Sequence, residues 1–146
     1  MAFRIPPEDC DRIAAALHAR YAPRLRDERF AVTGRVEPGF VELAVALERL
    51  DRSQRYEMAF RAALAENRMG EEAARDLLLD FVGYYLDQYF EGGRDPLLPL
   101  DFQPYEMGSH VVYARGDVTF PLLDAEADRI LDAGVPLPPA RPRGQG

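Results

Sequence analysis

The side chains with which enzymes most often form covalent bonds or move protons are scarce in this sequence. It has eighteen arginines, no lysine and one cysteine, Cys10. Histidine, serine and threonine occur twice each, as His18, His110, Ser53, Ser109, Thr33 and Thr119. Nucleophiles and general bases come mainly from these types, so the composition favours binding over catalysis. The absence of lysine also excludes a lysine Schiff base and a phosphate-loop lysine.

Two small groups of reactive residues have spacings that argue against catalysis. Cys10 and His18 lie eight residues apart on one expected helix, whereas side chains that touch along a helix are three or four residues apart. Ser109, His110 and Asp117 contain the residue types of a catalytic triad. Neighbouring residues of a hairpin strand point to opposite faces, and a triad is defined by geometry rather than by sequence. We therefore predict no catalytic residue, and expect Cys10 to be a small buried hydrophobe.

A row of carboxylates in the segment 71–91 is the strongest candidate for a functional surface. At helical spacing the acids fall within a stripe roughly 100° wide, which is the pattern of an amphipathic helix. Oxygen ligands would suit Mg²⁺ or Mn²⁺, but di-iron bundles need Glu-x-x-His pairs and neither histidine is near, so we predict no metal and no cofactor. A solvated face, a partner-binding face and a seam of ion pairs all remain open. The acids of the stripe are Glu72, Asp76, Asp80, Asp87 and Glu91, and the arginines that could form the seam are Arg49, Arg52 and Arg55.

Aromatic residues are concentrated in the same part of the chain. Their usual role is in the core, but tyrosine can also line a ligand pocket or an interface, and the sequence leaves both open. Tyr84 and Tyr85 cannot share one helix face, so one of them is expected to reach a second layer or another subunit. Nine of the fifteen aromatics lie between residues 81 and 120: Phe81, Tyr84, Tyr85, Tyr89, Phe90, Phe102, Tyr105, Tyr113 and Phe120.

The net charge of −7 is distributed unevenly along the chain. Residues 1–68 carry twelve arginines and eleven acids, whereas residues 69–146 carry six arginines and fourteen acids. Such a C-terminal half repels phosphate backbones, which disfavours nucleic acid and favours a basic protein as partner. A negative surface that serves only solubility explains the same charge.

The length of 146 residues fits one domain. We expect a globular part over residues 1–134 and a disordered tail rich in Pro and Arg over residues 135–146, with a PxxPxR match at 136–141 that resembles SH3 ligands. One cysteine cannot form an internal disulfide. The N-terminus has no apolar segment of signal-peptide length, and no run approaches the ~18 apolar residues of a membrane span. These features predict a cytoplasmic protein with no membrane partner.

Apolar periodicity and breaking residues predict a mainly helical fold. We expect helices over 6–22, 71–91 and 119–131, and over 40–64 either two consecutive helices, 40–50 and 51–64, that break near Asp51 or one long bent helix. A short hairpin is expected over 105–113, with its turn at Gly108-Ser109. The segment 24–39 fits either a short strand and turn or a connector. The predicted architecture is therefore a small domain of four or five helices with a β-hairpin near the C-terminus.

Together these features favour a non-catalytic module that binds a more basic protein, as an adaptor, a chaperone or an inhibitor of the immunity type. The residues predicted to bind the partner are Asp76, Asp80, Asp87, Glu91, Tyr84 and Tyr89. A small-molecule-binding protein or enzyme with an aromatic pocket and carboxylates around residues 80–117 is one alternative. A structural homo-oligomer that buries the central helix between subunits is the other.

Overall fold

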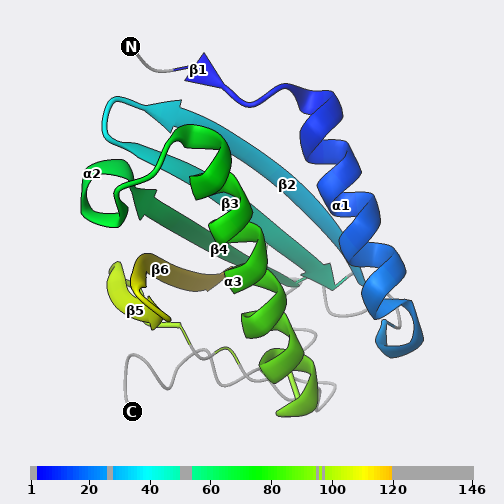
Figure 1. The fold of residues 1–146 in the computed structure, drawn as a ribbon. Coiled ribbons are helices and arrows are strands. Elements are labelled where there is room, and N and C mark those ends of the chain that lie inside the picture. The colour runs from blue at the N-terminus through cyan, green and yellow to red at the C-terminus, as the bar shows by residue number, and fades with distance from the viewer. Residues whose placement is uncertain (1–2, 26–27, 50–53, 95, 97, 120–146) are drawn as a thin grey trace.

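The computed structural model describes residues 3–25, 28–49, 54–94, 96 and 98–119, and folds them into one antiparallel sheet with helices on one face (Figure 1). The strands lie in the order β1-β2-β3-β4-β6-β5. The prediction of a mainly helical domain is therefore wrong. The elements are β1 (Phe3–Arg4), α1 (Pro7–Tyr21), the 3-10 turn η1 (Ala22–Arg24), β2 (Glu28–Glu37), β3 (Phe40–Arg49), β4 (Gln54–Ala63), α2 (Leu64–Asn67), α3 (Glu71–Glu91), β5 (Gln103–Met107) and β6 (His110–Thr119).

The segment 40–50, predicted to be a helix, contains strand β3 instead. Its core side is the alternating set Val41, Leu43, Val45 and Leu47, each no more than 1% exposed. Alternation with β-branched residues is the pattern of a half-buried strand. The sequence did not reveal the strand because Ala44 and Ala46 interrupt the polar positions between Glu42 and Glu48 on its opposite side, so the apolar residues also fit helical spacing.

Strand β4 replaces the second helix predicted over 51–64. Its buried side chains are Tyr56, Met58, Phe60 and Ala62. The spacing of four residues between Tyr56 and Phe60 is a multiple of two, so it fits one face of a strand as well as one face of a helix. Residues 51–53 of this prediction lie outside the described residues.

Two hairpins of the described sheet, β2–β3 and β5–β6, turn through two residues each. Pro38 and Gly39 join β2 to β3, and Gly39 has a φ of +101°, which favours glycine. This places β2 in the segment 24–39, where the sequence left strand and connector open. The turn at Gly108 and Ser109 joins β5 to β6, with Gly108 at a φ of +64°. A hairpin thus lies where the sequence predicted one, but it forms the edge of a large sheet.

Helices α1 and α3 lie where the sequence predicted helices. Pro7 opens α1, and acids fill the first turn of α3, as the helix dipole favours. Gly92 ends α3 by donating its N–H to the carbonyl of Gln88. None of the described helices is both long and apolar enough to cross a membrane. The helix predicted over 119–131, the domain boundary at 134 and the tail 135–146 lie outside the described residues, apart from Thr119, which ends β6.

The core lies between the helix layer and one face of the sheet. Helix α1 packs on β2, and α3 packs on β3 and β4. Two surfaces follow from this arrangement: the outer side of the helices, and the face of the sheet opposite the helices (Figure 1). No described helix covers that second face, which we call the open sheet face.

Candidate functional site

The outer side of α3 carries a row of exposed acids with an exposed tyrosine. We call this surface the acidic face, and the ring of Tyr84 is its main apolar group, because this residue is 55% exposed. Successive members are four residues apart from residue 72 to residue 84, so they follow one line along the helix. The acidic face comprises Glu72, Asp76, Asp80, Tyr84 and Glu91, all of them exposed.

In the described part of the chain, no arginine forms an ion pair with Glu72, Asp76 or Asp80. The ion pairs predicted between Arg55 and the acids of this helix are absent, because Arg55 lies on the open sheet face. There its guanidinium contacts Glu48 at 2.5 Å and Glu57 at 2.7 Å. The side chain of Arg49 and all of Arg52 fall outside the described atoms. The row therefore repels itself along the helix, because like charges four residues apart destabilise it.

Asp87, a predicted partner-binding residue, is engaged within the chain. Its carboxylate accepts a hydrogen bond from the Tyr21 hydroxyl at 2.7 Å and another from Arg20 at 2.7 Å. These contacts join α3 to α1. Asp87 is half-buried, so its main described role is to hold the helix layer together.

Tyr89 and most of the other aromatic residues of α3 lie in the core. Tyr89 is 2% exposed and stacks on Tyr56 with ring centroids 5.6 Å apart. The hydroxyls of Tyr56 and Tyr85 are 2.5 Å apart, and burial raises the pKa of Tyr56. Phe60 and Phe81 pack edge to face beside them. The rings fill the space that a ligand pocket among them would need.

Two pairs of described reactive residues, Cys10 with His18 and His110 with Asp117, are not brought together. Cys10 is buried and burial raises the pKa of its thiol, whereas His18 is exposed on the same helix. His110 and Asp117 lie seven residues apart on β6, which is about 23 Å along a strand. Among the described residues there is no group of three potential metal ligands.

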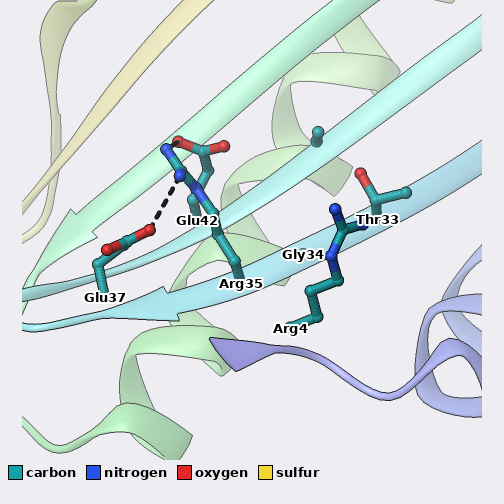
Figure 2. A pocket seen from close by; sticks show the side chains of 7 residues that line it. Arg4, Thr33, Gly34, Arg35, Glu37 and Glu42 are labelled. Atoms are coloured by element: carbon teal, nitrogen blue, oxygen red, sulfur yellow. Dashed lines mark hydrogen bonds and ion pairs between the residues drawn. The ribbon is translucent and has the colours of Figure 1, made fainter. Parts of the chain in front are cut away.

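A second candidate surface, missed because its strands were interpreted as helices, is the open sheet face. Two hollows of about 350 Å³ and 200 Å³ lie on it. Both are lined by Thr33, Glu42 and Ala44, so they are continuous. Figure 2 shows the larger hollow, where the side chain of Arg4 points toward Thr33, and Arg35 lies beside Glu37 and Glu42.

Two surfaces are thus the candidates: an acidic helix face with a central tyrosine, and an open sheet face with a continuous hollow. No protein-family model, no curated protein and no solved structure matches this chain.

Proposed function

We propose that this protein is a non-catalytic binding module that engages a more basic protein through the acidic face of α3. The observation that carries the proposal is the exposed row of Glu72, Asp76 and Asp80, which no described arginine neutralises. Each like-charged neighbour at a spacing of four costs a helix about 0.2–0.5 kcal/mol. Natural sequences break such local rules mainly at functional sites. A partner that brings cations to the row would relieve the repulsion.

The exposure of Tyr84 also supports a partner-binding role for the acidic face. Its ring is more exposed than those of the core tyrosines, and it follows Asp80 by one helical turn. Tyrosine is enriched among the residues that dominate binding energy, because its ring packs while its hydroxyl bonds. The surrounding carboxylates add electrostatic attraction, which speeds association with a basic surface and orients it.

The alternative of an aromatic ligand pocket receives no such support. The rings of Tyr56, Tyr85 and Tyr89 pack on one another, and the described hollows lie elsewhere. A binding role therefore agrees better with both the scarcity of nucleophiles and the position of the exposed groups.

The test compares capture of partners from native lysate by the wild-type chain and by three variants. Asp80→Arg and Tyr84→Ala alter the acidic face. Glu57→Arg is the matched control, because it makes the same change of charge at an exposed acid on the open sheet face. The proposal expects one basic protein, retained by the wild type and the control and lost from both α3 variants.

Salt supplies the second readout, since surface electrostatic contacts weaken as the Debye length falls to about 3 Å at 1 M. The partner should dissociate as salt rises. A partner that Asp80→Arg and Glu57→Arg release equally, or that neither α3 variant affects, would contradict the proposal. Recovery of the chain alone, as an oligomer, would favour the structural homo-oligomer instead.

A further inference from the structure

The open sheet face carries two rows of ion pairs that run across the strands. In one row Glu42 lies between Arg35 and Arg61, in register on β2, β3 and β4, with Arg61 Nε 2.6 Å from the carboxylate. In the other row Glu48 lies between Arg29 and Arg55. Its carboxylate is 2.6 Å from Nε of Arg29 and 2.5 Å from Nη1 of Arg55. In both rows, therefore, each glutamate is held between two arginines of the neighbouring strands.

Small side chains lie between the two rows and form a floor. Thr33, Ala44 and Ala59 face one another directly across β2, β3 and β4, and Ala31 faces Ala46 in the next pair. The two hollows lie over this floor and share lining residues. We call this continuous depression the trough. It crosses the sheet from the β1 side to β6.

Each end of the trough has an arginine without a carboxylate partner among the described residues. Arg4 lines the hollow at the β1 end, where its side chain points toward Thr33 (Figure 2). Arg115 lines the hollow at the β6 end, and its guanidinium lies 5.4 Å from the centroid of the Phe102 ring. The arginines of the ion-pair rows differ from Arg4 and Arg115 in having a carboxylate partner, since Arg35 and Arg61 both contact Glu42. Within the described part of the chain, the trough therefore has at each end an arginine whose charge no carboxylate neutralises.

We infer that the trough binds an extended acidic peptide segment with one carboxylate for Arg4 and one for Arg115. Four interstrand steps separate β1 from β6, or about 19 Å at about 4.8 Å for each step. An extended chain rises about 3.3 Å per residue, and residues an even number apart share a face. The two carboxylates therefore lie about six residues apart. Small side chains between them match the floor, where alanine and threonine allow a close backbone approach.

The negative net charge of the protein does not oppose this assignment, because charge is segregated between the two layers. Helix α3 carries six acids and one arginine, whereas β2, β3, β4 and β6 together carry six acids and six arginines. A helix is about 10 Å across, so the acidic face lies farther from the trough than a Debye length of about 8 Å at physiological ionic strength. A nucleic acid fits less well, since Glu37, Glu42 and Glu57 line the trough and repel a continuous phosphate backbone.

The probe is an acetylated and amidated heptapeptide with aspartate at both ends and alanine, serine and glycine between them. It is titrated into the full chain labelled with ¹⁵N, and two-dimensional spectra report each amide. The assignment expects saturable shifts at Thr33, Ala44, Ala59 and Arg115. The same peptide with asparagine at both ends should cause much smaller shifts. Equal shifts with either peptide, or shifts confined to other elements, would overturn the assignment.

Variants of the trough test separately whether peptide binding depends on its charges and on its shape. Arg4→Gln and Arg115→Gln should each weaken binding about threefold to fivefold, the effect of losing one exposed ion pair. Arg4→Gln tests this at an exposed edge residue, where packing is least affected. Ala44→Leu should abolish binding by filling the floor without a change of charge. Binding unchanged in all three would overturn the proposal.

Asp80→Arg is the control for independence from the acidic face, and it should leave peptide binding unchanged. Failure of either proposal can therefore be recognised without reference to the other. The alternative occupant of the trough that the test must distinguish is a second copy of the chain. Shifts of the same amides that depend on protein concentration without peptide, together with a dimer mass, would assign the trough to self-association and overturn the peptide assignment.

Discussion

The hydroxyl of Tyr21 on α1 lies 2.7 Å from the carboxylate of Asp87 on α3, although 66 residues separate them in sequence. The same hydroxyl is 3.0 Å from the carbonyl of Gly83. A hydroxyl has one proton to donate, and the shorter distance favours the carboxylate. Burial, followed by this hydrogen bond, raises the pKa of Tyr21. The contact therefore fixes the spacing of the two helices.

Replacement of Asp87 is expected to reduce stability, whereas replacement of Asp80 is not. Asp87→Ala removes the acceptor of Tyr21 and Arg20 and should cost about 1–2 kcal/mol. Asp80→Ala, at an exposed position on the same helix, should change the free energy of unfolding by less than about 0.5 kcal/mol. Urea unfolding at neutral pH measures both. Equal effects would show that the link between the helices carries no net stability.

The helices could be predicted from the sequence because their ends carry local signals. Pro7 opens α1, and Gly92 with Gly93 follows α3. Strands β3 and β4 could not, because Ala44, Ala46 and Ala59 lie at the middle of their solvent side and interrupt the polar half of the alternation. The Pro38-Gly39 pair, a turn signal, is the local feature from which the hairpin of β2 and β3 could have been predicted.

Of the two candidate surfaces, likewise, one could be predicted from the sequence and the other could not. Exposure of Asp76, Asp80 and Tyr84 follows from helical periodicity alone, so the acidic face could be found from the sequence. The engagement of Asp87 depends on how two helices meet, which local sequence does not encode. The trough depends on register across the strands, since a slip of one residue would turn Arg61 away from Glu42.

The paired hydroxyls of Tyr56 and Tyr85 should be energetically coupled. Tyr56→Phe and Tyr85→Phe each remove one partner of a buried contact of 2.5 Å and should each cost about 1 kcal/mol. The double variant should cost less than the sum, because the second change removes a group that has already lost this partner. Additive effects in urea unfolding would mean that the two hydroxyls do not interact.

Alkaline pH gives a second test of the buried tyrosines. Burial raises the pKa of Tyr56 above its ordinary value of 10.0. The unfolded chain then loses this proton at lower pH than the folded chain, so stability is full below pH 10 and falls as the pH rises further. Tyr56→Phe should reduce this fall, as measured by urea unfolding across that range. An unchanged alkaline limb would contradict the assignment of the loss to Tyr56.

Acid pH should weaken the rows of ion pairs on the open sheet face. The hydrogen bond from Arg29, with the charges of Arg29 and Arg55, lowers the pKa of Glu48 below its ordinary value of 4.5. A carboxyl whose folded pKa is depressed adds stability above the unfolded pKa, and that stability is lost as the pH falls through the folded value. Glu48→Gln should lower stability modestly at pH 7 and leave it nearly unchanged at low pH. A loss of equal size at both pH values would indicate a packing effect instead.

The strongest expectation concerns the acidic face, where a stabilising change should impair binding. Asp76→Lys places a cation between Glu72 and Asp80, so two repulsive pairs at a spacing of four become attractive. The helix should gain about 0.5–1 kcal/mol, and most of the gain should disappear at 1 M salt. The same variant should bind a basic partner less tightly, because one anchoring charge is reversed. Urea unfolding at low and high salt measures the first effect, and titration with the captured partner measures the second. A row kept only for solubility would show the gain in stability without the loss of binding, whereas a row kept for recognition shows both.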